Sequence, residues 1–186
     1  DVDRSRGLGD VYKRQRLDGW APEIFSIGHR NPQGLAFHPT TGALWSHEHG
    51  PRGGDEINII TAGDNYGWPT VSHGKEYIGG TIGIGTSAPG LADPAWVWTP
   101  SIAPSGMAFY GGSMFPQLNG HLLVGSLKFK RLYLVQLSAG VPQDEFVILD
   151  GSIGRVRDVA VESDGAILLL SDEPDGGLYR LHEAGQ

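Results

Sequence analysis

The sequence predicts an all-β fold, and three observations support this. Short apolar segments alternate with clusters of Gly, Pro, Asn and Asp. No window of about 11 residues shows the 3.6-residue apolar period of an amphipathic helix. Glycine, at 29 of 186 residues, supplies the turns, and hairpins are expected to reverse at Thr41-Gly42, Asn119-Gly120 and Asp164-Gly165. The predicted strands are 23–27, 33–37, 43–47, 56–60, 106–109, 121–126, 132–137, 145–149, 158–161, 166–171 and 177–181.

These strands fall into a repeated unit. The segments 33–50, 105–127 and 157–173 share a short apolar strand, a Gly-containing turn, a second apolar strand and a polar or acidic ending. The first strands recur at Phe37, Phe109 and Val161, intervals of 72 and 52 residues, which suit propeller blades with insertions. A closed propeller has about four to eight blades. About three blades are predicted here, so the chain would be an open part of a propeller with exposed edges. A β-sandwich is the alternative fold.

Composition excludes several classes of function. The net charge is -7, from 14 Lys and Arg against 21 Asp and Glu, so no basic surface is expected to bind nucleic acid or an anionic membrane. The longest apolar run is about five residues, far below the roughly 20 that a membrane span needs. The sequence has no Cys, which excludes disulfides and thiolate metal sites.

The first 15 residues differ from the rest of the chain. They mix basic and acidic residues without periodicity, and they are typical of translated cloning or adapter sequence. A native disordered arm is the alternative. We therefore assign 1–15 as a leader and 16–186 as the propeller domain, and we expect the chain to be a piece of a longer protein.

Basic residues precede several predicted strands. Arg30 and Asn31 stand directly before Pro32, which favours an extended predecessor and begins a strand. Arg155 and Arg157 occupy the same place in the last repeat, and Lys128 ends a strand of the middle one. First strands line the central channel of a propeller. The pattern favours an anionic ligand with several carboxylates or phosphates, because guanidinium groups bind these bidentately. Solvent-exposed loop residues are the alternative.

The stretch HEHGPRGGDEIN, residues 47–58, is rich in metal-binding groups. His47 and His49 would share a strand face, which is one start of a transition-metal site. The oxygen donors that follow suit calcium better, and a polar turn that ends the strand is the simpler alternative. The expected donors are backbone carbonyls of Gly50 and Pro51, the carboxylates of Asp55 and Glu56, and the carbonyl of Tyr66 in the turn GDNYGWP.

Two tryptophans, Trp96 and Trp98, share one face of an extended segment and precede Thr99 and Ser101. Aromatic rings beside hydroxyl groups can form the wall of a site for a planar ligand or a sugar. Core packing explains the same spacing.

The motifs GHRNPQGLAF, HEHGPRGGDEINII, GDNYGWP, PSGMAFYGG and RVRDVAVESDGAILLLSDE occur in this order. Together they resemble the C-terminal half of the glucose/sorbosone dehydrogenase family, over residues 24–181. The resemblance implies part of a six-bladed β-propeller and two cofactors, pyrroloquinoline quinone (PQQ) and calcium. It also implies oxidation of the C1 hydroxyl of an aldose to the lactone by hydride transfer to PQQ.

The resemblance assigns roles by position. Arg30 and Asn31 would contact the quinone, with Arg30 polarising the developing alkoxide as the catalytic residue. The remaining cofactor-binding positions are Ser101, Ala103, Lys128, Arg155 and Arg157, of which the last three would hold carboxylates. Gly50 and Pro51 would bind the calcium beside PQQ, and Glu56 and Tyr66 a second, structural calcium.

The resemblance also sets limits. Thr99 and Ser101 replace the Trp and Thr that the family's glucose dehydrogenases place beside the cofactor, so sugar preference is open. The family's histidine base belongs to the N-terminal half, and we expect this chain alone to be inactive. An external electron acceptor, a homodimer and a periplasmic or secreted location are further expectations. A non-catalytic binding module and a calcium-dependent lactonase are the alternative functions.

Overall fold

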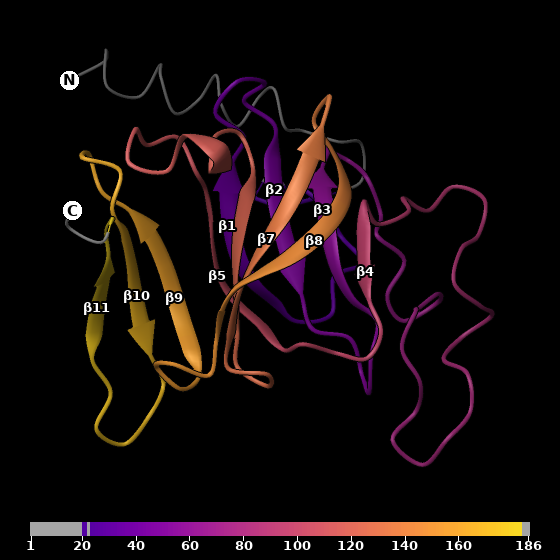
Figure 1. Ribbon diagram of the computed structural model, residues 1–186. Coiled ribbons are helices and arrows are strands. Elements are labelled where there is room, and N and C mark those ends of the chain that lie inside the picture. Colours follow the sequence, from indigo (N-terminus) through magenta and orange to yellow (C-terminus); the bar gives the residue numbers. More distant parts are fainter. Residues whose placement is uncertain (1–19, 22, 184–186) are drawn as a thin grey trace, which may run out of the picture.

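A computed structural model of the chain describes residues 20–21 and 23–183 (Figure 1). The predicted leader, 1–15, lies outside the described residues. The fold is all-β apart from the single-turn 3-10 helix η1 (Pro116–Leu118). The first sheet contains β1 (Pro32–Phe37), β2 (Leu44–Glu48), β3 (Asp55–Ile60) and β4 (Trp96–Trp98). The second contains β5 (Pro104–Phe109), β6 (Leu122–Ser126), β7 (Arg131–Ser138) and β8 (Val141–Asp150). The third contains β9 (Val156–Val161), β10 (Ile167–Ser171) and β11 (Leu178–Leu181).

The three sheets are blades of a β-propeller, which confirms the predicted fold class. Each is an antiparallel meander in which consecutive strands pair. The first strands of the blades lie side by side, since β1 contacts β5 and β5 contacts β9 (Figure 1). The residues that directly precede β1, β5 and β9 therefore lie along the inner edge of the three blades.

The two faces of β6, both buried, show how the blades pack. Leu122 and Val124 join Trp45 and Ile57 of the first blade in one hydrophobic core. Leu123, on the opposite face of β6, belongs to the core shared with the third blade. The middle blade is thus buried on both faces, which explains its near-continuous apolar sequence. Burial of each such side chain contributes about 1.5–3 kcal/mol.

Turn chemistry follows the sequence prediction. Gly42, Gly120 and Gly165 all have positive φ, at 68°, 78° and 90°, in the predicted turns. At Gly165 a Cβ would approach the backbone nitrogen of Met114 to 2.6 Å, so space as well as conformation requires glycine.

The predicted strand at 23–27 is wrong. Its only ladder contact is an isolated parallel bridge between Ile27 and Asn65. The physical reason is that no described strand lies alongside this segment, and a strand needs a neighbour to form a hydrogen-bonded ladder.

No helix of the described residues is long and apolar enough to cross a membrane.

Candidate functional site

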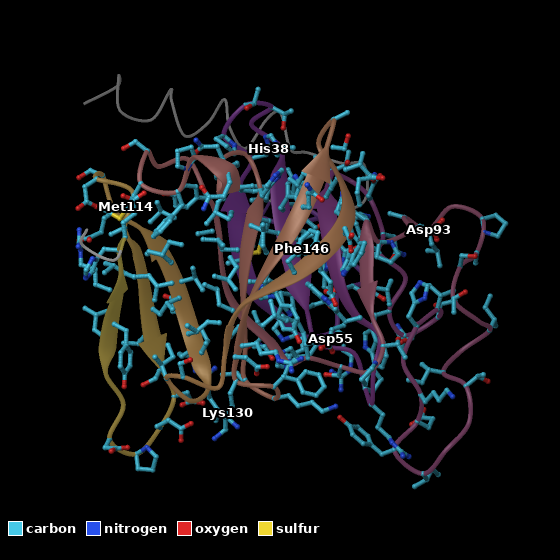
Figure 2. All side chains as sticks on the ribbon, viewed as in Figure 1. His38, Asp55, Asp93, Met114, Lys130 and Phe146 are labelled. Carbon is cyan, nitrogen blue, oxygen red and sulfur yellow. The ribbon has the colours of Figure 1, made fainter. Side chains whose placement is uncertain are left out.

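Most of the predicted site residues lie at one end of the blades. In Figure 2 the labels of Asp55 and Lys130 mark this end, and His38 and Met114 mark the opposite one. The segments that reach the site end are the approach to β1, the β2–β3 connection and the approach to β5.

Glu48, at the end of β2, organises the approach to β1, and the sequence analysis missed it. The residue is 5% exposed, and its Oε2 accepts hydrogen bonds from the backbone N–H groups of Arg30 and Asn31. Oε1 lies 3.1 Å from Nδ1 of His29 and 3.1 Å from Nδ2 of Asn58. Burial raises the pKa of Glu48, but the hydrogen bonds from His29, Arg30 and Asn31 outweigh it and hold the pKa below its ordinary value. This carboxylate fixes the backbone of the predicted quinone-contacting pair.

The Arg30 side chain is held on two sides. Its Nη1 donates to the carbonyl of His49 at 2.8 Å, and the guanidinium lies 5.3 Å from the centre of a Trp68 ring. Asn31 is exposed, and its Oδ1 accepts from Gln33 at 2.9 Å. Arg30 also borders a cavity of about 10 Å³, close to the volume that one water or ion needs. Other residues around it include Glu48, Gly50, Glu56 and Ser72.

Asp55, at the start of β3, is a second carboxylate that holds neighbouring segments in place. The sequence predicted it only as one of several oxygen donors. It is fully buried, and its Oδ1 accepts the N–H of Gly50 at 2.9 Å. Its Oδ2 accepts the hydroxyl of Ser101 at 2.7 Å and the N–H groups of Ile102 and Ala103 at 2.8 and 2.9 Å. Asp55 thereby ties the predicted calcium-binding turn to the predicted cofactor-binding segment. Ala103 has a φ of +52°, so its backbone is held in the left-handed region.

Among the acidic residues of the site, Glu56 has the pKa that departs furthest from its ordinary value. Burial raises its pKa to about 7, and the neighbouring charges of Glu48 and Asp55 add to the shift. A cation beside this carboxylate would relieve both effects. No group of three or more His, Asp or Glu side chains suited to a metal occurs among the described residues. The predicted calcium ligands are mainly backbone carbonyls, so the absence of such a group of side chains does not test them.

The other predicted calcium ligands are less closely grouped. The Pro51 carbonyl accepts the N–H of Lys75 at 2.9 Å. The Tyr66 hydroxyl donates to the carbonyl of Ile59 at 2.6 Å, and its ring stacks on His29 at 4.7 Å. Neither Pro51 nor Tyr66 borders the small cavity beside Arg30. The structure therefore brings Gly50 and Glu56 together around one cavity, with Pro51 and Tyr66 nearby in the chain.

The third blade holds the second group of predicted cationic residues. Nε and Nη2 of Arg155 donate to Oδ2 of Asp172 at 3.1 and 2.9 Å, and Nη2 of Arg157 donates to the same oxygen at 2.6 Å. Hydrogen bonds from Arg155 and then Arg157 hold the pKa of Asp172 below its ordinary value. Glu173 accepts the backbone N–H of Arg155 at 2.9 Å. Two guanidinium groups thus converge on one carboxylate oxygen, and a second carboxylate, that of Glu173, lies beside Arg155.

Lys128, in the middle blade, is exposed, and its Nζ lies 5.0 Å from the centre of the Phe129 ring. Within the described part of the chain, no hydrogen bond or ion pair joins Lys128, the Arg155–Arg157 pair and Arg30 to one another. The predicted residues form separate groups on three blades.

For two patterns of the sequence the structure favours the alternative without a ligand. His47 is fully buried with both ring nitrogens unpartnered, and no group of three or more His, Asp or Glu side chains suited to a metal accompanies it among the described residues. His49 donates from Nε2 to the Pro104 carbonyl at 2.6 Å. Burial lowers the pKa of His47 to about 4, with a further contribution from His49. Trp96 and Trp98 pack in or against the core of the first two blades instead of forming a ligand wall.

The fold and site define an open part of a β-propeller with arginine-bearing approaches to the first strands and an acidic, partly buried cavity. Residues 12–180 match the model of the Glucose / Sorbosone dehydrogenase family. The chain belongs to this family.

Several members resemble the chain closely. The aldose sugar dehydrogenase YliI of Escherichia coli is 42% identical over 165 residues, which cover 88% of this chain and 44% of that protein. A solved glucose dehydrogenase aligns with a TM-score of 0.85 and 44% identity, over 90% of this chain and 49% of its own. The PQQ-bound aldose sugar dehydrogenase of Streptomyces coelicolor aligns with a TM-score of 0.68 and 29% identity, over 89% of this chain and 46% of its own. The chain thus spans about half the length of these relatives.

Proposed function

We propose that this chain is the C-terminal half of a PQQ- and calcium-dependent aldose sugar dehydrogenase. The enzyme would oxidise the C1 hydroxyl of an aldose to the lactone and pass the electrons to an external acceptor. The observation that carries the proposal is the fixed Arg30–Asn31 pair, held by Glu48 beside an acidic cavity. The similarity to aldose sugar dehydrogenases and to a PQQ-bound relative supports it.

The residues present fit both groups. PQQ carries several carboxylates, and the chain offers Lys128, Arg155 and Arg157 as partly or fully exposed cations at the site end. Calcium requires oxygen donors and negative charge, and Glu56 lies in a cavity bordered by a second carboxylate and by Gly50. Burial, with the neighbouring charges of Glu48 and Asp55, raises the pKa of Glu56, and a cation bound beside the carboxylate would offset the cost of its charged form.

When bound, PQQ would supply the hydride acceptor for C1 of the sugar, and calcium would supply Lewis-acid chemistry. Arg30 stabilises developing negative charge, because its guanidinium is already fixed by the His49 carbonyl and Trp68 and needs no reorganisation. Glu48 keeps the backbone of Arg30 and Asn31 in place. Asp55 holds Ser101 and Ala103 in position as further contacts.

Arg155 and Arg157 bind and orient carboxylates, and Asp172 holds their two guanidinium groups together. The base that accepts the C1 hydroxyl proton is assigned to the half of the relatives that this chain does not span. We further propose a periplasmic or secreted location for the whole enzyme.

The test is activity of the chain joined to the N-terminal half of its Escherichia coli relative. With PQQ, calcium and an aldose, this chimera should reduce a dye. An Arg30→Ala chimera should bind PQQ and lose at least about 100-fold in kcat, as expected for removal of a stabilising donor. A folded chimera that binds neither PQQ nor calcium would contradict the proposal and leave a non-catalytic binding module as the better explanation.

A further inference from the structure

A cavity of about 370 Å³ lies at the end of the blades opposite the candidate site, the end that the label of His38 marks in Figure 2. Its volume is in the range of small-molecule sites, roughly 300–1,000 Å³. The β1–β2 turn, the connection before β6 and the β7–β8 turn border it. The cavity therefore lies at the junction of the first and middle blades, between two four-stranded sheets.

His38, in the β1–β2 turn, borders this cavity with its ring held in place. Its Nδ1 accepts the backbone N–H groups of Thr40 and Thr41 at 3.2 and 3.3 Å. The ring packs on Phe109, with the ring centres 4.9 Å apart, and the residue is only 8% exposed. Because Nδ1 is an acceptor, the neutral imidazole carries its proton on Nε2.

His121 repeats this arrangement on the middle blade. Its Nδ1 accepts the backbone N–H of Leu137 at 3.2 Å, so its neutral ring also carries the proton on Nε2. No described residue accepts a hydrogen bond from Nε2 of either ring. Both Nε2 atoms reach solvent, because the fully buried side-chain nitrogens without a partner in the described part of the chain belong to other residues. Two N–H donors, one from each blade, therefore open on one cavity.

These hydrogen bonds decide which kind of ligand the two histidines suit. A metal ion binds the lone pair of a neutral imidazole, and in both rings that lone pair already accepts backbone N–H groups. The free N–H groups suit a hydrogen-bond acceptor instead, and a carboxylate is a strong one. Among the described residues that border the cavity there is no Asp, Glu, Lys or Arg. A bound anion would therefore meet no like charge on the cavity wall.

We propose that this cavity binds a small organic anion through a carboxylate, which accepts hydrogen bonds from Nε2 of His38 and Nε2 of His121. Thr41 and Asn119 border the same cavity and offer a hydroxyl and an amide as further donors. The site is preformed, because backbone N–H groups hold both rings before a ligand arrives. This inference is independent of the proposed function, since it uses no residue of the proposed PQQ or calcium sites.

Calorimetric titration of succinate into the chain tests the proposal, and saturable binding is expected. His38→Asn and His121→Asn should each weaken this binding at least about tenfold. In both variants the Asn carbonyl can replace Nδ1 as the acceptor of the backbone N–H groups, whereas the Nε2 donor is lost. His182→Asn is the matched control and should bind like the parent chain, because His182 is exposed beside β11 and does not border the cavity. Circular dichroism confirms that each variant is folded.

Succinamide is the control for the ligand, because it has the same carbon chain and carries no charge. It should bind at least about tenfold more weakly than succinate. The proposal is overturned if the parent chain shows no saturable binding of succinate, or if either Asn variant binds succinate as tightly as the parent does. Equal binding of succinate and succinamide overturns it as well.

Nitrogen-15 NMR of the histidine rings tests the donors directly, at about pH 8, where an ordinary imidazole is neutral. Before succinate is added, the rings of His38 and His121 should both carry their proton on Nε2. On addition of succinate these two Nε2 signals should shift, and those of His182 should not. A proton on Nδ1 in either of the two rings, or Nε2 signals that succinate leaves unchanged, overturns the proposal.

Discussion

The arginines of the first and third blades are positioned in different ways. Arg30 depends on a carboxylate that is 5% exposed and on the fully buried Asp55 network next to it. Arg155 and Arg157 share Asp172, whose side chain is 35% exposed. In the first blade the carboxylates of Glu48 and Asp55 therefore stabilise both the fold and the site. In the third blade the carboxylate orients a pair of cations and contributes little to stability.

The largest expected effect is that of Asp55→Asn. Three backbone N–H groups and one hydroxyl would lose a charged acceptor in a buried position, and the free energy of unfolding should fall by about 3–5 kcal/mol. Urea denaturation measures this. Asp172→Asn is the matched control in the third blade and should change the midpoint little. Equal losses of unfolding free energy in the two variants would show that Asp172 contributes as much to stability as Asp55 does.

Glu56 gives the first blade a pH dependence near neutrality, whereas the shifted carboxylates of the third blade have lowered pKa values. Its folded pKa of about 7 lies above its ordinary value of 4.5, so its contribution to stability is complete below pH 4.5 and is lost as the pH rises through 7. Without calcium, Glu56→Gln should be more stable than the parent chain at pH 8 by on the order of 2–3 kcal/mol. Calcium should then stabilise the parent chain and not the variant. If the stability of the parent chain and of Glu56→Gln changed with pH in the same way, Glu56 would not be the group responsible for the pH dependence.

His47 gives the first blade a sensitivity to acid. Its folded pKa of about 4 lies below its ordinary value of 6.5, so the stability it contributes is present above pH 6.5 and is lost as the pH falls to about 4. The loss should be on the order of 3 kcal/mol. Replacement by Leu should flatten the profile between pH 6.5 and 4, as measured by thermal unfolding. An unchanged slope in His47→Leu would show that another group is responsible.

Asp172→Asn is expected to change stability least of these substitutions. Its main effect should be on ligand binding. In a chimera with the N-terminal half of a relative, Asp172→Asn should leave the melting temperature nearly unchanged. It should weaken PQQ binding several-fold, because the two guanidinium groups lose the carboxylate that holds them together. Fluorescence titration measures this. Tighter binding by the variant would indicate that Asp172 competes with the ligand.

The blades could be predicted from sequence because their signals are local. Alternation, Gly-containing turns and the repeat around Phe37, Phe109 and Val161 each lie within a short window. Glu48 and Asp55 were not assigned as organising residues because their partners are distant in the chain. Asp55 accepts from Ala103, 48 residues away, and no pattern in one sequence encodes that pairing. Their one local signal was acidic character at the ends of apolar strands.

Segment 23–27 shows the opposite limit. Its local pattern is that of a strand, yet its one ladder contact among the described residues is the bridge between Ile27 and Asn65, and a strand without a neighbour has no ladder. Local sequence predicts what a segment can form, and the rest of the molecule decides whether it does.

The decisive measurement is a titration of PQQ, with calcium present, into the chimera of this chain and the N-terminal half of its Escherichia coli relative. The dehydrogenase proposal predicts saturable, calcium-dependent binding that Arg155→Ala with Arg157→Ala weakens at least about tenfold. A folded, calcium-loaded chimera that binds no PQQ, or binds it equally well with both arginines removed, would contradict the proposal.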